Sequence, residues 1–294
     1  MKKLLAVVLL LALCAGCAFA EGEASGKFRE GHLAWAGVSA EEYVELIADC
    51  MSNDKYPWIN YEISIPEYSP YYKTEDSYET DIIVYFDSIN EMILALDAGK
   101  IDSFELFQPV ANYFFRQNNN ADKYLPLVYT QGVNYYLSMG FKEGSKWLER
   151  FNSAIKAMNE DDTLLFLKAK YVDYAKDDLK PITFEKFPDA ETVKIAVTGD
   201  MPPLDYIAAD GTPAGFNTAL LAEIGKRLKV NIELVSINTG ARAAALASGK
   251  SDGVFWFWYS NSADSLQDTP SGVVLTEPYY SIDTLVYIGR KIHK

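Results

Sequence analysis

A run of four consecutive aromatic residues is the feature of the sequence that most directly indicates a binding surface. The run is Trp256-Phe257-Trp258-Tyr259, within a β-rich stretch that we expect to be a strand. Alternation along a strand would place Trp256 and Trp258 on one face. Phe255, Phe257 and Tyr259 would then lie on the other face. Four bulky rings exceed what a buried strand needs, and aromatic rings offer flat faces to a ligand.

Residues suited to catalysis are scarce. The chain has two histidines, His32 and His293, and both lie near its ends. A histidine-based metal site or a Ser-His triad therefore has almost nothing to be built from. Asp200, Asp205 and Glu277 are the carboxylates placed to act as a general acid or base. We expect a binding protein with no catalytic residues, no metal and no cofactor, and keep an enzyme as the less favoured alternative.

The elements that would position these residues alternate in the C-terminal part of the chain. The hydrophobic patterns predict strands over 193–197, 231–236 and 254–259 and helices over 217–228 and 240–248. This order predicts a parallel sheet covered by helices. Ligands of such sheets bind at the carboxyl ends of the strands, so the loop that follows residue 197 is an expected binding loop.

The earlier part of the chain shows patterns of both kinds. The expected helices cover 39–51, 90–98, 109–117, 147–159 and 163–174, and the expected strands cover 81–86 and 104–107. Residues 52–80 are rich in Tyr, Pro, Ser and Asp and predict a long surface loop. Residues 177–191 are polar, contain two prolines and show no periodicity, so we expect a linker there.

One short sequence occurs twice. Residues 95–102 (Ala-Leu-Asp-Ala-Gly-Lys-Ile-Asp) match residues 245–252 (Ala-Leu-Ala-Ser-Gly-Lys-Ser-Asp). In both copies the pattern predicts a helix end, a glycine in the left-handed cap and an aspartate at the start of a strand. Such a repeat fits two similar α/β lobes. It also places Asp102 and Asp252 at the end of the sheet away from the expected binding loops.

The N-terminal residues resemble an export signal. A short basic start is followed by an apolar run from Leu4 to Leu13, which is too short to span a bilayer. Two interpretations of the cleavage site remain open. Ala18-Phe19-Ala20 is a site for ordinary signal peptidase, which would make residues 1–20 a signal peptide. Ala15-Gly16-Cys17 resembles a lipobox, which would attach a lipid to Cys17. Both interpretations send the chain across the cytoplasmic membrane.

Composition narrows the class of protein further. A net charge of -14 argues against nucleic-acid binding, because a phosphate backbone demands a basic surface. Cys50 is the one cysteine beyond the export signal, so no internal disulfide is expected. No second long apolar run follows, and a lipid at Cys17 would be the one attachment to a membrane. The length suits two lobes in a monomer.

Residues from Val193 to about Lys291 resemble the periplasmic amino-acid-binding proteins, family 3 of the solute-binding proteins. The matching pieces, in order, are Pro202-Pro203, Gly211, Gly215-Phe216, Ala245-Leu246 and Thr276-Glu277-Pro278-Tyr279-Tyr280. The resemblance implies an α/β fold like that of type II periplasmic binding proteins, with two lobes and mixed, mostly parallel sheets.

The segments that resemble this family stand in a displaced order. Residues 21–125 resemble lobe 2, residues 126–176 resemble the closing segment of lobe 1, and residues 192–291 resemble the main part of lobe 1. The linker 177–191 joins the last two. The order looks like a circular permutation or a truncated tandem pair. It implies that the chain crosses between the lobes once, near residues 118–130.

The resemblance also implies where a ligand would bind. Asp200, Leu204 and Tyr206 lie on the first loop, where the family usually has an aromatic residue at the position of Leu204. Arg242 fills a position that is often arginine, and a cation there can pair with a carboxylate. The aromatic run stands where the family has small polar residues and then an arginine. Phe107-Gln108 stands where it has an aspartate for the amino group. We expect all of these residues to contact the ligand. Because both amino-acid anchors are absent, we expect an aromatic, sugar-like or less charged solute.

These features together predict an exported solute-binding protein that delivers a small molecule to the permease of an ABC importer. It would work in the periplasm or at the cell surface. A ligand sensor or surface-binding module on the same fold is the second hypothesis. A lyase on the same fold is the third, and it would need a general acid or base at the ligand.

Overall fold

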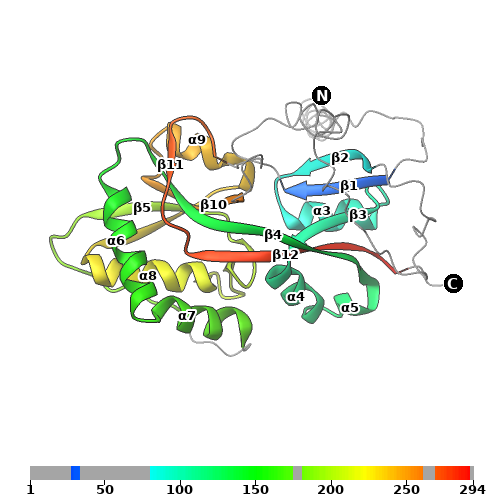
Figure 1. Cartoon of the computed structure of the whole chain (residues 1–294), viewed down its shortest axis with the longest axis horizontal. Coiled ribbons are helices and arrows are strands. Elements are labelled where there is room, and N and C mark those ends of the chain that lie inside the picture. Colours follow the sequence, from blue (N-terminus) through cyan, green and yellow to red (C-terminus); the bar gives the residue numbers. More distant parts are fainter. Residues whose placement is uncertain (1–27, 34–79, 175–180, 261–268, 292–294) are drawn as a thin grey trace, which may run out of the picture.

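The structure, a computed structural model, describes residues 28–33, 80–174, 181–260 and 269–291. These residues form two lobes that are joined by two long strands (Figure 1). The helix expected over 39–51, most of the loop expected over 52–80 and the export signal with Cys17 lie outside the described residues. Within the described part, no helix is long and apolar enough to cross a membrane.

Lobe 2 is formed mainly by the first half of the chain. Its strands are β1 (Phe28–Leu33), β2 (Thr80–Phe86) and β3 (Ser103–Phe107), and its helices are α3 (Ile89–Asp97), α4 (Gln108–Arg116) and α5 (Asn120–Lys123). β1 pairs in parallel with both β2 and β3. Helix α3 begins where the Ser88 hydroxyl accepts a hydrogen bond from the Glu91 amide, as a capping serine does. The four elements predicted between residues 81 and 117 are confirmed.

Lobe 1 contains the elements predicted in the C-terminal part. Its strands are β5 (Thr192–Val197), β6 (Asp200–Met201), β7 (Asp205–Ile207), β8 (Pro213–Ala214), β9 (Asn231–Ser236), β10 (Gly253–Ser260) and β11 (Val273–Leu275). Its helices are α6 (Trp147–Glu160), α7 (Thr163–Lys168), the π-helix η1 (Ala169–Asp173), α8 (Phe216–Leu228), the 3-10 helix η2 (Thr239–Ala241) and α9 (Arg242–Ala247). β5 lies parallel to both β9 and β10, which confirms the predicted parallel core.

Two long antiparallel strands join the lobes. They are β4 (Tyr124–Lys142) and β12 (Tyr280–Arg290), and they pair from Tyr280 opposite Leu137 to Arg290 opposite Tyr124. β4 also pairs with β10 in lobe 1, and β12 also pairs with β3 in lobe 2. One mixed sheet therefore runs through the described part in the order β2-β1-β3-β12-β4-β10-β5-β9, with β11 on β4. The predicted α/β class with mixed sheets is confirmed.

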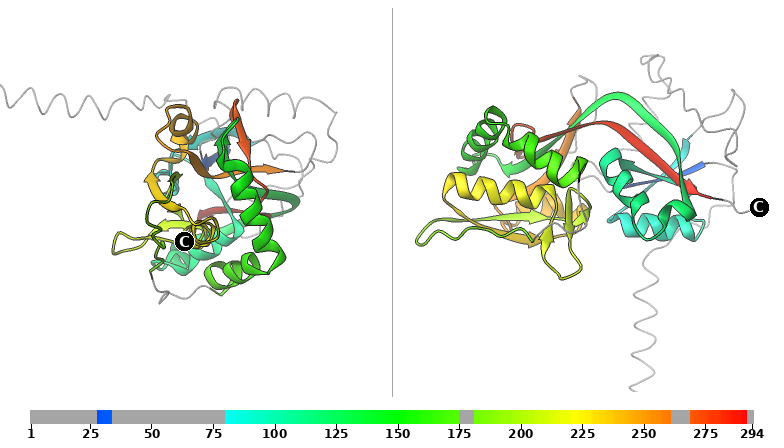
Figure 2. Two further views of the ribbon diagram at one scale, coloured as in Figure 1. Left: turned by 90° about the vertical axis from the view of Figure 1, so that its left-hand side faces the viewer. Right: turned by 90° about the horizontal axis from the view of Figure 1, so that it is seen from below.

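The prediction of a single crossing between the lobes is wrong. β4 carries the chain from lobe 2 to lobe 1, and β12 carries it back, as the arch in the right-hand view of Figure 2 shows. The displaced order of segments retains the second crossing because β12 follows directly after the Tyr279-Tyr280 end of lobe 1. The pairing of β4 with β12 shifts register between Ile282 and Thr284 and again between Tyr287 and Ile288. A two-stranded connection of this kind is suited to hinge motion.

The duplicated helix ends adopt the predicted conformation. Gly99 and Gly249 both have positive φ angles, +67° and +71°, and each follows a helix. Asp252 stands at the start of β10, where its carboxylate accepts a hydrogen bond from the Lys194 amide at 2.8 Å. That position is at the opposite end of β5 from the loop after Val197. Asp252 therefore has the structural place that its position in the repeat predicted.

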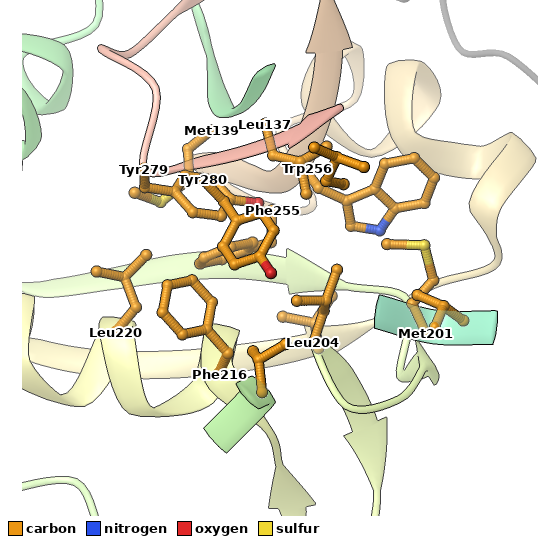
Figure 3. Close-up of a cluster of buried hydrophobic side chains, with 14 of the residues drawn as sticks. Leu137, Met139, Met201, Leu204, Phe216, Leu220, Phe255, Trp256, Tyr279 and Tyr280 are labelled. Atoms are coloured by element: carbon orange, nitrogen blue, oxygen red, sulfur yellow. The ribbon is translucent and has the colours of Figure 1, made fainter. Parts of the chain in front are cut away.

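The hydrophobic core extends through both lobes of the protein. A large cluster of buried apolar side chains extends from Leu96 and Phe104 in lobe 2 to Phe151 and Leu220 in lobe 1. Figure 3 shows the part of this cluster that underlies the expected binding loop, with Leu204, Phe216, Phe255 and Tyr279 among its members. A second, smaller cluster packs α9 against β5 and β10. The loop is thus anchored on a solid apolar base.

Candidate functional site

The two lobes meet through a pair of tyrosine rings. Tyr113 lies on α4 of lobe 2 and Tyr206 lies on β7 of lobe 1, and their ring centroids are 6.0 Å apart with a 39° angle between the planes. We call them the interlobe tyrosine pair. Asp200 is directly opposite Tyr206 in the β6–β7 ladder, so both side chains lie on the same face. A carboxyl group therefore stands beside Tyr206.

A second set of aromatic contacts joins the lobes through β4. The ring of Phe107, at the end of β3, lies 6.2 Å from that of Tyr135 on β4. Tyr135 in turn meets Trp258 of β10 edge to face at 5.4 Å. All three side chains are half-buried. Gln108, which follows Phe107 at the start of α4, is also half-buried.

Tyr259 lies on the other face of the β4–β10 pair. It is directly opposite Tyr136, and the two rings stack at 5.4 Å with 25° between their planes. Consecutive residues of a strand point to opposite faces. Tyr136 and Tyr259 are therefore separated by the sheet from the contact between Tyr135 and Trp258.

The predicted alternation holds from Trp256 to Tyr259 but is wrong at Phe255, because β10 contains a bulge. Val254 is opposite Gly140 and Phe257 is opposite Ser138, so two residues of β10 face one residue of β4. Phe255 and Phe257 consequently belong to different apolar clusters. Trp256 absorbs the extra residue with a φ of +49°, a conformation that is rare and costly for a bulky side chain.

Arg242 is enclosed in lobe 1 with 1% of its surface exposed. Its Nη1 donates a hydrogen bond to the Trp256 carbonyl oxygen and its Nε donates one to the Thr239 carbonyl oxygen, both at 2.9 Å. The guanidinium also lies over the Trp256 ring at 4.0 Å. These contacts commit Arg242 to holding the bulge of β10, and they leave its charge facing protein groups.

The expected binding loop is held by a buried carboxylate. Asp205 accepts hydrogen bonds from the amides of Thr198 and Gly199, at 3.0 and 3.1 Å, and from the Thr198 hydroxyl at 3.3 Å. Leu204, next to it, is fully buried in the large core cluster. The loop thus presents Asp200 and Tyr206 outward while Leu204 and Asp205 fasten it from within.

Burial changes the acidity of both aspartates of the loop. Desolvation raises the pKa of Asp200 above its ordinary value, and hydrogen bonds and the charge of Arg242 oppose the increase. Desolvation, reinforced by the nearby Asp200, raises the pKa of Asp205 to about 6 from 3.8, against the opposing hydrogen bonds of Gly199 and Thr198. Both carboxyl groups therefore hold their protons to a higher pH than an exposed aspartate does.

The raised pKa of Asp205 predicts a stability that falls with rising pH. The folded state holds this proton up to about pH 6, whereas the unfolded chain releases it near pH 3.8. Stability from this group is therefore present at about pH 4 and is lost as the pH rises to about 6. Relative to the Asp205→Asn variant, whose amide oxygen can still accept the loop hydrogen bonds, the natural protein should lose about 2 kcal/mol of unfolding free energy between pH 4 and pH 7. Urea denaturation at the two pH values measures this, and an unchanged difference would contradict the assignment.

A metal site in the described residues would need a cluster of ligating side chains. No group of three or more His, Cys, Asp or Glu side chains that could hold a metal is found among them. Two surface hollows lie elsewhere on lobe 1. One, of about 820 Å³, is bordered by α8, η1 and residues 181–185, and the other, of about 440 Å³, lies beside Asn231 and residues 186–188. The junction of the lobes offers aromatic faces and a carboxyl group, which are groups for recognition.

A two-lobed α/β scaffold with recognition groups at its junction defines the class of a ligand-binding protein. Residues 193–287 match the family of bacterial extracellular solute-binding proteins, family 3. The match confirms the predicted resemblance over β5 to β12, the part that contributes Asp200, Tyr206 and Trp258. Curated protein sequences gave no match.

The chain is also partly similar in structure to several solved proteins, including the following three. The ligand-binding component of an ABC-type import system from Staphylococcus aureus, with zinc bound, has 11% identity and a TM-score of 0.39 over 90% of this chain and 65% of its own. The chain thus spans less than two thirds of that protein. The methionine-binding protein MetQ has 12% identity and a TM-score of 0.38 over 90% and 83%. The oxidised form of OxyR has 13% identity and a TM-score of 0.37, over 91% of this chain and 87% of its own. All three TM-scores lie below 0.5, so these likenesses add nothing to the family match.

The structure divides the predicted ligand residues into two groups. Asp200, Tyr206, Phe107 and Trp258 lie partly exposed where the lobes meet, and Gln108 is half-buried at the start of α4. The others are enclosed in lobe 1 or, for one tyrosine, lie on the opposite face of the sheet: Leu204, Arg242, Trp256, Phe257 and Tyr259. The sequence analysis missed Tyr113 and Tyr135, whose place at the junction depends on how α4 and β4 pack.

Proposed function

We propose that this protein is an extracytoplasmic receptor that binds a small solute between its two lobes. The observation that carries the proposal is the meeting of Tyr206 of the family-matched segment with Tyr113 of the other lobe. Rings from two bodies joined by a pair of strands can close on a solute and exclude water from it. The enclosed arginine supports a solute that is not held by the charge clamp typical of amino-acid binders.

We also propose that the receptor serves an ABC importer, with a permease as its partner. This proposal rests on the family of residues 193–287, whose members are typically extracytoplasmic. Export from the cytoplasm, through either cleavage after Ala20 or lipid attachment at Cys17, belongs to the same proposal. We also propose that the protein is a monomer.

The proposal predicts that a bound solute moves the lobes relative to each other, because Tyr113 and Tyr206 already contact each other in the structure. The full mature chain would be screened by thermal shift against amino acids, peptides, sugars and aromatic compounds. A ligand at about 100 times its Kd should stabilise the fold by about 2.7 kcal/mol, which raises Tm by several degrees. Small-angle scattering with that ligand should then show a changed radius of gyration. A screen in which no solute raises Tm, or a tight ligand that leaves the radius of gyration unchanged, would contradict the proposed function.

A further inference from the structure

We infer that the interlobe tyrosine pair is a binding site in which a planar ligand ring stacks between Tyr113 and Tyr206. The ligand ring is uncharged or carries an N–H donor. This inference rests on the proposed function, because it assumes that a solute enters between the lobes. It adds the chemical class of that solute and the two residues that bind it. Tyr113 supplies the ring from lobe 2 and Tyr206 supplies the ring from lobe 1.

The geometry of the pair is close to that of a ring sandwich. Carbon atoms in contact lie about 3.5 to 4.0 Å apart, so two rings that hold a third between them stand about 7 to 8 Å apart. The Tyr113 and Tyr206 centroids are 6.0 Å apart, with a 39° angle between the planes. A separation by about 1 to 2 Å and a rotation to parallel would therefore admit a flat ligand. Because the rings belong to different lobes, the irregular β4–β12 connection can supply this small movement.

The charges beside the pair select against anions. Asp200 is directly opposite Tyr206, and Asp205 lies on the same loop. The Asp200 carboxyl group is largely buried, with the Thr198 and Thr239 hydroxyls as neighbouring donors. A carboxylate has several acceptor sites, so a ligand N–H can still donate to it. Arg242, the cation of the same loop region, donates hydrogen bonds to the carbonyl oxygens of Thr239 and Trp256, and its charge offsets part of that of Asp200.

The second aromatic set extends the same chemistry across the junction. Phe107, Tyr135 and Trp258 form contacts of 6.2 and 5.4 Å from lobe 2 through β4 to lobe 1. Half-buried rings of this kind provide apolar area to a ligand without adding charge. Two independent aromatic contacts between the same two lobes favour a flat ligand over a flexible or strongly charged one.

The ligand class is tested with matched compounds on the full mature chain. Indole, nicotinamide and adenine supply planar rings with N–H groups. Nicotinate changes the charge of nicotinamide, and cyclohexanecarboxamide keeps its amide but removes the flat ring. Isothermal titration calorimetry should give saturable binding for at least one of the planar compounds. Nicotinate and cyclohexanecarboxamide should bind at least tenfold more weakly than nicotinamide where nicotinamide binds.

Substitutions then test whether the rings of Tyr113 and Tyr206 contact the ligand. Tyr113→Leu and Tyr206→Leu should each weaken binding of the planar ligand about tenfold, whereas Tyr113→Phe and Tyr206→Phe, which keep the ring, should change it less than threefold. The double leucine variant should be little weaker than either single variant, because a sandwich needs both rings. Tyr174→Leu is the matched control, since Tyr174 on lobe 1 is 77% exposed and makes no ring contact with the junction residues. Circular dichroism and Tm verify that each variant folds.

The outcomes separate this inference from the proposed function. If planar compounds bind and the two leucine variants lose them, both stand. If a sugar, peptide or amino acid binds and changes the radius of gyration while planar compounds do not bind, the function stands and the stacking site is overturned. The stacking site is also overturned if planar compounds bind equally well to the leucine variants and to Tyr174→Leu. If no solute of any class binds, the proposed function itself fails.

Discussion

Methionine in place of Arg242 should lower the free energy of unfolding by about 4 kcal/mol in urea denaturation at pH 7. The substitution leaves the buried Trp256 carbonyl oxygen without the donor that now lies 2.9 Å away, which costs about 1 to 3 kcal/mol. It also removes a desolvated cation from the face of the Trp256 ring, at 4.0 Å, which costs about 2 kcal/mol. Methionine keeps the apolar stem, so little is lost from packing. Trp256 depends on these contacts because its φ of +49° is strained.

A surface arginine with the same chemistry is the control for this prediction. Arg150 lies over the Trp147 ring at 4.5 Å and donates a hydrogen bond to Glu191, yet its side chain is 33% exposed. Water and salt screen such contacts, so Arg150→Met should cost about 1 kcal/mol or less. Equal losses for the two variants would show that burial of Arg242 does not determine its effect. Arg242→Lys should fall between them, because lysine keeps the charge and loses the planar fork.

The elements that were predicted correctly are those whose apolar pattern is set by their own lobe. Helix α8 buries Leu220, Leu221 and Ile224 on the core, and this spacing is visible in the sequence. β4 and β12 were not predicted as long strands because they pass from one lobe to the other. Their outer residues pair across the lobes, as Leu285 does with both Phe107 and Thr130. One face of β12 is nonetheless buried at every second residue, at Tyr280, Ile282, Thr284, Val286 and Ile288, so its alternation could have been recognised in the sequence.

The candidate site was predicted in part for the same reason. Tyr206 and Trp258 follow or lie in strands whose carboxyl ends were recognisable, and the structure brings them to the junction. Tyr113 was missed because the sequence does not say which face of α4 meets the other lobe. The bulge of β10 was missed because it requires a positive φ at Trp256, where the sequence has neither glycine nor asparagine to signal it. The enclosure of Arg242 follows from that bulge.

Alanine in place of Gly215 should lower the free energy of unfolding by about 4 kcal/mol. It should also lower the affinity for any ligand that the expected binding loop contacts. Gly215 has φ +98° and ψ 179° at the start of α8, a region that only glycine occupies readily. A Cβ atom there would lie 2.7 Å from the carbonyl oxygens of both Pro203 and Leu204. Those oxygens accept hydrogen bonds from the Phe216 and Asn217 amides and so fix the loop to the helix. Backbone atoms cannot swing aside, so the helix or the loop must shift.

The same substitution at Gly211 separates steric contact from backbone strain. Gly211 also has a positive φ, +83°, but a Cβ atom there would meet nothing within 4 Å. Gly211→Ala should therefore cost about 1 kcal/mol, the penalty of the backbone conformation alone. The excess loss at Gly215 would measure how tightly α8 and residues 203–204 are pressed together. If both variants lost about 1 kcal/mol, the loop would be free to move away from α8. The positions of Asp200 and Tyr206 would then not be fixed by the core of lobe 1, and the hinge alone would have to align the tyrosine pair.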